Sequence, residues 1–294
     1  MTTIEDTLRR LEKILDAAKN DNPHSVKILD AYWPLILKRA RLVDTLDLGG
    51  NEPASLDKEL FKKGIPLFGQ NAFFRENDPF ETVAQELLPA LRQGFSSQCG
   101  VWDKFAGLLD ARAIRLYDFF GSFPSDGEDV LSRWAEMLGT DSQVTGFLVR
   151  AIARVILEKR SRNHSEAIKG LIWEKGYCPM CGTFRDITKH LEGSGQRWLH
   201  CPLCGHEWRF RRVVCPCCEN DDQKTMTYFH IENKETESCF ICEKCKCYLI
   251  TVTKVSDITE YDPDIAVLSL AYLDVIMQGK GYSPMSECEL NEYS

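Results

Sequence analysis

The sequence predicts an α+β protein in which an N-terminal all-α helical domain precedes two tandem cysteine-rich modules and a C-terminal helix. Three observations support this prediction. Apolar residues follow a helical period through roughly the first 160 residues. Eleven of the thirteen cysteines then lie between Cys178 and Cys247. Short strand-like segments alternate with these cysteines, which is the pattern of hairpins rather than of helices.

The first helical segments follow from local sequence signals. Apolar residues from Ile4 to Ala18 fall on one helical face, and a capping start is indicated by Thr2, Thr3 and Glu5. A second helical pattern begins near Pro23, but Pro34 lies inside it. Because proline lacks a backbone N–H and clashes with the preceding turn, we expect the helix to kink or restart there.

The later helices follow an irregular connection. Periodicity fails from Gly49 to Asn77, where Gly, Pro and Asn are common and the segment GIPLF occurs. Asp78 before Pro79 is a cap signal that predicts a helix extending to about Leu91. Further single helices are expected from Trp102 to Phe120, from Glu128 to Leu138, and over the apolar stripe from Val144 to Ile156.

Composition changes after this stripe. The polar segment SRNHSEAIKG bridges to the cysteine-rich part, and a mostly apolar helix is expected from Asp264 to Met277, before the acidic ending SECELNEYS. We therefore predict four parts: residues 1–165 as the helical domain, 166–210 and 211–255 as two cysteine modules, and 256–294 as the C-terminal helix and acidic tail.

Four CxxC pairs dominate the cysteine-rich part. They supply eight thiolates, enough for two tetrahedral four-sulfur metal sites. The first two pairs have the sequences CPMCG and CPLCG; proline fixes φ early in the turn, and glycine accepts the left-handed conformation that closes it. The candidate metal ligands are Cys178, Cys181, Cys201, Cys204, Cys215, Cys218, Cys242 and Cys245.

Loop lengths favour pairing the CxxC motifs in sequence order. This gives CxxC-x19-CxxC for the first site and CxxC-x23-CxxC for the second, and shorter loops cost less entropy to close. Strands are expected at ITKHL, RWLH, EWRFRRVV, MTYFHI and CYLITVTKV, so each CxxC would lie at a hairpin tip. Zinc ribbons and rubredoxin-type modules are built in this way.

Other potential ligands lie in the same region. Cys217, Cys239 and Cys247 are surplus to two four-cysteine sites. CPCC allows either Cys217 or Cys218 as its second ligand, and the CxxC spacing favours Cys218; Cys239 and Cys247 offer competing choices beside the fourth pair. We interpret the three surplus cysteines as spare or core thiols. Four histidines are expected to be ordinary strand or surface residues: His190, His200, His206 and His230. Four thiolates suit both zinc and iron, so the sequence does not decide which of the two metals binds.

Catalytic and nucleic-acid functions are not favoured by the sequence. It contains no GxSxG, GxxxxGK[ST], HExxH or GxGxxG motif, and no catalytic residue is proposed. Residues 176–250 carry ten Lys/Arg and ten Asp/Glu, and only Arg209, Arg211 and Arg212 cluster. A nucleic-acid binder normally presents a basic face. The sequence shows neither a signal-peptide pattern nor a long apolar run, so we expect a cytoplasmic protein without membrane insertion.

A specific series of motifs runs through the cysteine-rich part: CPMCG, Arg197, Leu199, CPLCG, Trp208, Arg211 and CPCC in that order, then CEKCKCYL and DIAVLSLAYLDVIMQGKGY. On these motifs the chain resembles, over most of its length, the FdhE family of formate dehydrogenase accessory proteins. Lys246 stands where that family tends to have glycine. The resemblance implies rubredoxin-like modules that bind iron, and a non-enzymatic cytoplasmic maturation factor whose partner is the catalytic subunit of formate dehydrogenase. A rubredoxin-like electron-transfer protein and a zinc-ribbon nucleic-acid binder are the alternatives.

Overall fold

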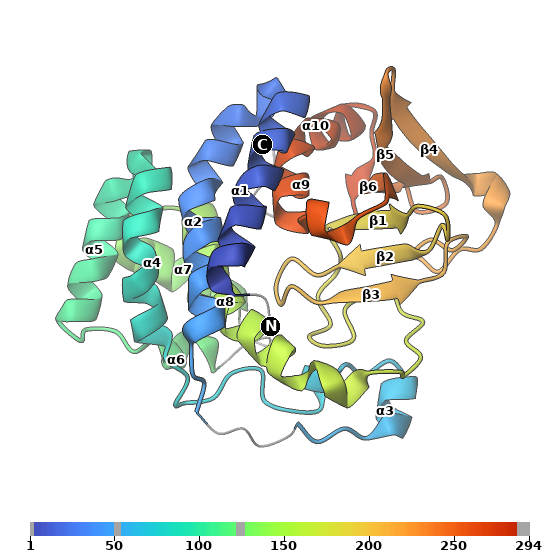
Figure 1. Ribbon diagram of the computed structural model, residues 1–294. Coiled ribbons are helices and arrows are strands. Elements are labelled where there is room, and N and C mark those ends of the chain that lie inside the picture. The colour runs from blue at the N-terminus through green and yellow to red at the C-terminus, as the bar shows by residue number, and fades with distance from the viewer. Residues whose placement is uncertain (1–2, 50–53, 122–126, 287–294) are drawn as a thin grey trace.

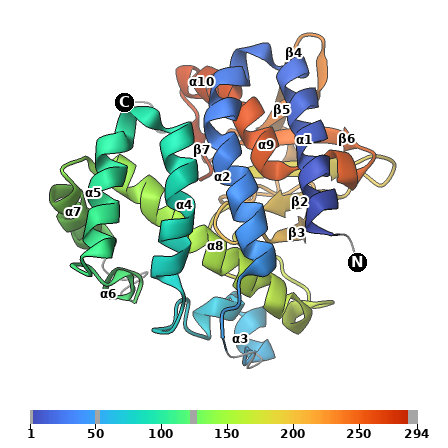
Figure 2. The same cartoon turned by 60° about the vertical axis from the view of Figure 1, so that its left-hand side comes forward.

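A helical body lies beside a mixed β-sheet in the computed structural model, which describes residues 3–49, 54–121 and 127–286 (Figure 1). Both views place α2 between the α4–α5 side of the body and the side that faces the sheet (Figures 1 and 2). The helices of the body are α1 Ile4–Asp21, α2 Val26–Thr45, α3 Lys58–Lys62, α4 Phe80–Gly94, α5 Cys99–Asp110, α6 Leu116–Phe120, α7 Gly127–Leu138 and α8 Ser142–Ile168.

The helix α1 begins at a capping box. The Thr3 hydroxyl accepts a hydrogen bond from the Asp6 backbone N–H, and the Asp6 carboxylate accepts one from the Thr3 backbone N–H. These bonds satisfy donors that the first helical turn leaves free. Leu8, Leu11 and Leu15 are buried on one face, which confirms the predicted amphipathic helix.

The helix α8 carries the apolar stripe and extends well beyond it. It is 27 residues long and ends at Ile168, so most of the polar segment SRNHSEAIKG is helical. Ile152, Val155 and Ile156 are buried in the main core. α8 packs against α2, α4 and α7, and therefore brings its C-terminal half from the helical body towards the cysteine-rich region.

The strands form a single mixed sheet that joins both cysteine-rich segments. Among the described residues it has seven strands in the order β3-β2-β1-β6-β5-β4, with β7 paired to β6. β1 pairs in parallel with β6, whereas its pairing with β2 is antiparallel. The strands are β1 Ile187–Leu191, β2 Arg197–His200, β3 Glu207–Phe210, β4 Met226–Ile231, β5 Lys234–Cys242, β6 Cys247–Val255 and β7 Ser283–Pro284.

Two helices follow the sheet and connect it to the body. α9 (Pro263–Ser269) packs against α1 and α2, and α10 (Ala271–Gly279) packs against β6. The carboxylate of Asp264 pairs with Arg39 from α2 and with Arg154 from α8. These ion pairs fix the sheet to the helical body, because α9 is only a few residues from β6.

Several helix predictions are wrong in detail. The single helices expected from Trp102 to Phe120 and from Asp264 to Met277 are each two helices; the second breaks at Leu270, which has φ −101° and ψ 8°. Pro34 does not cause a restart, since α2 continues through it. Asp78 makes no side-chain cap at the start of α4, and its carboxylate instead pairs with Arg160.

The remaining predictions concern boundaries and the tail. The segment from Ala54 to Asn77 is largely irregular, with the short helix α3 in it, as expected. The domain boundaries drawn from the sequence stay predictions. Most of the acidic ending SECELNEYS lies outside the described residues. Within those residues, no helix combines the length and the apolar character that a membrane span requires.

The main core is shared by the helical body and the cysteine-rich sheet. Phe61, Leu67 and Phe68 from the irregular connection belong to the same buried cluster as Cys178 and Met180. The first CxxC turn, residues 178–181, is called the first knuckle here, and the turns of the other CxxC motifs are named in the same way. Two backbone N–H groups of the GIPLF segment donate hydrogen bonds to this knuckle, from Leu67 to the Pro179 carbonyl and from Phe68 to the Met180 carbonyl. The first knuckle is therefore built into the core rather than exposed at a hairpin tip.

Candidate metal centres

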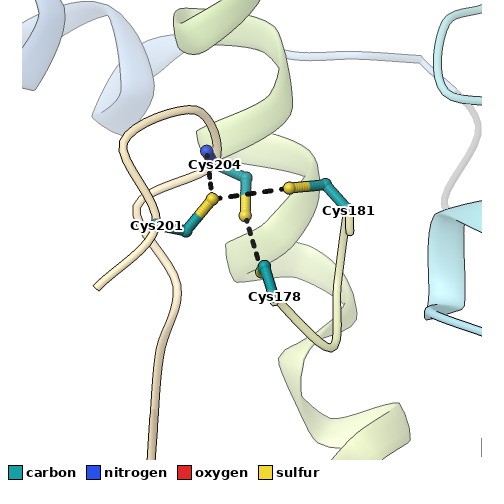
Figure 3. A group of neighbouring side chains, drawn as sticks. All are labelled: Cys178, Cys181, Cys201 and Cys204. Atoms are coloured by element: carbon teal, nitrogen blue, oxygen red, sulfur yellow. Dashed lines mark hydrogen bonds between the residues drawn. The ribbon is translucent and has the colours of Figure 1, made fainter. Parts of the chain in front are cut away.

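The first four-cysteine cluster is compact and buried. Figure 3 shows the side chains of Cys178 and Cys181 converging with those of Cys201 and Cys204. The Sγ atoms of Cys178 and Cys204 are 3.6 Å apart, and those of Cys181 and Cys201 are 3.4 Å apart. Thiolates at the usual zinc–sulfur bond length of a tetrahedral site are about 3.8 Å apart. The relative exposure of the four cysteines is at most 4%, so an ion here would be closed off from solvent.

The knuckles of this cluster have the turn geometry that their sequence predicts. Gly182 and Gly205 have φ values of 82° and 66°, in the left-handed region. Their N–H groups donate to the carbonyls of Cys178 and Cys201, at 2.9 and 3.1 Å. The Cys201 sulfur also accepts a hydrogen bond from the Cys204 N–H at 3.4 Å. Such N–H···S contacts stabilise a thiolate and therefore favour metal binding.

The second cluster has the predicted membership but is more open. Two sulfur pairs, Cys215 with Cys245 and Cys218 with Cys242, are each 3.8 Å apart. All four sulfurs lie within 4.8 Å of one another. Cys218 is exposed and Cys245 is half-buried. The structure therefore groups the CxxC motifs in sequence order, the first with the second and the third with the fourth. Each of the two clusters is able to bind a metal ion.

The second cluster closes its knuckles without glycine. Glu219 and Lys246 both have φ 57°, at the positions that Gly182 and Gly205 occupy in the first cluster. Their N–H groups donate to the Cys215 and Cys242 carbonyls at 3.0 and 2.8 Å. A side chain in the left-handed region costs energy that glycine avoids. The second cluster thus keeps the same turn, with backbone strain at Glu219 and Lys246.

Burial opposes charge on the first cluster's sulfurs. Desolvation raises the pKa of Cys178 and of Cys201, because a thiolate loses the stabilisation of water there. A divalent ion with four thiolates still carries two net negative charges. The same desolvation makes the histidine beside this cluster neutral, since it lowers the pKa of His206 to about 4.

Two buried arginines lie near the second cluster. Arg185 and Arg197 have relative exposures of 0% and 1%. Arg197 donates to the Val214 carbonyl at 3.2 Å and stacks over the Phe240 ring at 4.5 Å. Burial lowers the pKa of Arg197 to about 10. Sequence reasoning missed Arg185, because its local sequence predicts an exposed charged residue.

The histidines join no cysteine group within the described ranges. The His200 ring lies 2.9 Å from the Asp186 carboxylate through Nδ1, and His190 packs edge-on against Tyr228. The groups that the structure does form are the two four-cysteine clusters and a third set, Cys217, Cys245 and Cys247. Cys239 is buried and belongs to none of the three, as its interpretation as a core thiol predicts.

The segment before the first knuckle packs tightly on the second cluster. A Cβ atom at Gly176 would lie 1.9 Å from the Pro216 carbonyl oxygen, inside the third CxxC motif. We expect Gly176→Ala to destabilise the protein by about 1–3 kcal/mol, because the backbone of a knuckle must move. Thermal unfolding measures this. Gly107→Ala is the matched control, since its Cβ would meet nothing within 4 Å in α5; an equal loss in both variants would contradict the close approach.

Together, the fold and its sites define a class of protein: a helical body joined to one mixed sheet that bears two four-cysteine clusters, each able to bind a metal ion. No family model matches the chain. The chain is 28% identical to an FdhE homologue of Haemophilus ducreyi over 159 residues, which are 53% of this chain and 50% of that protein. It is 30% identical to Protein FdhE of Escherichia coli over 120 residues, 38% of this chain and 37% of that protein.

The matched segments thus span half or less of these curated relatives. The fold extends the comparison: the crystal structure of the FdhE protein from Pseudomonas aeruginosa superposes with a TM-score of 0.57 at 20% identity, over 96% of this chain and 94% of that one. The chain is therefore similar in sequence to FdhE proteins over part of its length, and it shares the fold of one FdhE protein over nearly all of it.

Proposed function

We propose that the chain is a cytoplasmic accessory factor for the catalytic subunit of a formate dehydrogenase, and that it catalyses no reaction itself. The observation that carries this proposal is the joint presence of the FdhE-type fold and two cysteine clusters with complete four-thiol sets. Four protein thiolates leave no open coordination position for hydrolytic zinc chemistry. In this proposal the clusters have a structural or a redox role, and the remaining surface of the chain binds the partner.

We further propose that each cluster holds one metal ion, with iron favoured by the family resemblance and zinc as the alternative. The first ion would join the loop after α8 to the hairpin before β3, inside the main core. The second would join the segment after β3 to the β5–β6 turn. The ligands are those identified from the sequence: Cys178, Cys181, Cys201 and Cys204 for the first, and Cys215, Cys218, Cys242 and Cys245 for the second.

Capture of the partner tests the accessory role. The tagged full-length chain is co-expressed with a formate dehydrogenase catalytic subunit and purified without oxygen. We expect the subunit to co-elute with the chain and not with the tag alone. Repeated anaerobic captures in which the subunit stays in the flow-through would contradict the proposal, provided the chain itself unfolds cooperatively on heating.

Metal analysis with an absorption spectrum tests the alternative of electron transfer. Iron in four thiolates is coloured and redox-active, whereas zinc has neither property. An electron-transfer role requires visible thiolate-to-iron bands that bleach on reduction. Zinc in both clusters, with no visible bands, would exclude electron transfer and leave the accessory role in place.

A further inference from the structure

A third set of thiols adjoins the second cluster. The sulfurs of Cys217, Cys245 and Cys247 all lie within 4.8 Å of one another, and Cys217 and Cys247 are 3.7 Å apart. Cys245 belongs to this set and to the four-cysteine cluster as well. The two sets therefore share one sulfur, and together they contain six cysteines. A shared thiolate can bridge two ions, because a deprotonated sulfur has more than one lone pair.

The interpretation of Cys217 and Cys247 as spare thiols does not fit their surroundings. A spare cysteine normally fills a small apolar space, as Cys239 does at 0% exposure among apolar side chains. Cys217 is exposed, and Cys247 is half-buried at the start of β6. Cys217 lies in the third CxxC motif and Cys247 lies just after the fourth. The two thiols meet because these two turns face each other. Cys217 contributes no apolar burial, and Cys247 packs only partly buried against the main core.

A buried cation faces these thiols. The Arg185 side chain is fully buried, and its Nη1 atom donates to the Gly176 carbonyl at 3.4 Å. Among the described residues, its Nε and Nη2 atoms have no hydrogen-bond partner by geometry. Its neighbours of potentially opposite charge are the sulfurs of Cys217, Cys215 and Cys247. A guanidinium stays charged when buried and needs nearby negative charge, which thiols supply only as thiolates.

Thiolates this close repel one another unless a cation lies among them. Metal binding to thiols is coupled to release of their protons, so an ion both creates the thiolates and compensates them. With two divalent ions, six thiolates carry two net negative charges, the same as one ion with four thiolates. Arg185 can then offset one of these charges. A second ion therefore adds two sulfur ligands without adding net charge beside the buried guanidinium.

The first cluster provides an internal comparison. In the CxxC motifs, Cys217 occupies the third position and Cys247 the second position after the motif; the corresponding residues of the first cluster are Met180 and His206. Met180 is buried in the core, and a thioether is a far weaker ligand than a thiolate. The first cluster thus holds four thiols and the second holds six. The difference lies at the two positions that form the third set.

We propose that the second cluster is binuclear: Cys217, Cys245 and Cys247 hold a second thiophilic divalent ion of the Zn²⁺ or Cd²⁺ type, with Cys245 as the bridge. On binding, the Cys217 and Cys247 thiols each release one proton to solvent, and Cys247 gives up its contact with the Cys245 carbonyl at 3.4 Å. The fourth coordination position is open on the exposed side of Cys217 and takes water or an external thiol. This site rests on the proposed metal occupancy of the cluster that contains Cys215.

Counting bound ions tests this proposal. The reduced full-length chain is saturated with Cd²⁺ without oxygen, freed of excess metal on a desalting column, and analysed for metal per chain. We expect three ions in the unmodified chain and two in Cys217→Ser and Cys247→Ser. Cys239→Ala is the matched control, because it removes a thiol that belongs to no group, and it should retain three.

The possible results separate the two proposals. Two ions in the unmodified chain, or three in Cys217→Ser, would overturn the binuclear site and leave the four-cysteine sites intact. Fewer than two ions would overturn both. The chain is also reduced, loaded with metal without oxygen, and analysed by peptide mass mapping. A disulfide between Cys217 and Cys247 found at that stage would likewise exclude the third ion.

Stepwise chelation gives a second readout on the unmodified chain, for the case in which Cys217→Ser does not fold. We expect one of the three ions to leave first, since it has three protein ligands rather than four. Cys217 and Cys247 should become alkylated by iodoacetamide together with that loss, before the other eight ligands. Loss of all ions at one rate, or early loss without alkylation of this pair, would overturn the proposal.

Discussion

Replacing Cys178 with serine is expected to lower the midpoint of thermal unfolding by more than about 10 °C and to remove one metal ion from the chain. Cys178 is fully buried and its sulfur lies 3.6 Å from that of Cys204. The apparent binding free energy of a structural zinc ion is about 10–16 kcal/mol, and it is also folding free energy. A serine hydroxyl is a poor replacement for a thiolate, so several kcal/mol of this linkage should be lost.

Differential scanning calorimetry and metal analysis of the same preparation measure both parts of this expectation. Cys99→Ser is the control, since Cys99 lies in α5, is half-buried, and belongs to none of the cysteine groups. Cys247→Ser should also be mild, because its ion is additional to a complete four-thiol set. If all three variants lost the same stability, the ligand assignment of the first cluster would be wrong.

The grouping of the cysteines into two clusters was predictable because its information is local. A CxxC motif fixes a turn of a few residues, and the loop between two motifs limits which pairs can meet. The glycine turns at Gly182 and Gly205 follow from the same short sequences. The strand at Lys234–Cys242 was not predicted, since its first half, KETES, is mostly charged or polar and carries no apolar alternation.

The joining of the two cysteine segments was not predictable in the same way. β1 and β6 are separated by more than fifty residues, and they pair in parallel with Ile187 opposite Ile250. No turn residue encodes such a pairing, because it depends on burial of both strands within the finished sheet. The same holds for Arg185. A charged residue beside a strand predicts exposure, and only the assembled second cluster shows why this one is buried.

The predicted helix ends were wrong where tertiary contacts outweigh local sequence signals. Apolar spacing alone joined α5 to α6, but Arg112 between them has φ 52° and ends the helical path. Pro34 had the opposite outcome, since α2 continues through it and buries Leu35 and Ile36 in adjoining cores. Packing of the flanking residues compensates for the hydrogen bond that proline removes.

Asp78→Ala is expected to destabilise the protein by about 3–5 kcal/mol, far more than loss of a helix cap. The Asp78 carboxylate lies 2.5 Å from an Arg160 guanidinium nitrogen, with side-chain exposures of 0% and 4%. Arg160 also donates to the Phe73 carbonyl. Removing the carboxylate leaves a buried cation unpaired, which costs about 3–5 kcal/mol, whereas loss of an N-cap costs about 0.5–2 kcal/mol.

The size of this loss decides between the two roles of Asp78. Chemical denaturation of Asp78→Ala and Asp78→Asn gives the free energies of unfolding. Asparagine can replace a cap but not a charge, so we expect both variants to be strongly destabilised. Glu86→Ala is the control, because Glu86 on α4 pairs with Lys38 at the surface, where an ion pair contributes about 0–1 kcal/mol. A stable Asp78→Asn variant would restore the capping role. It would also mean that the ion pair does little to anchor α8, the helix that connects the body to the first cluster.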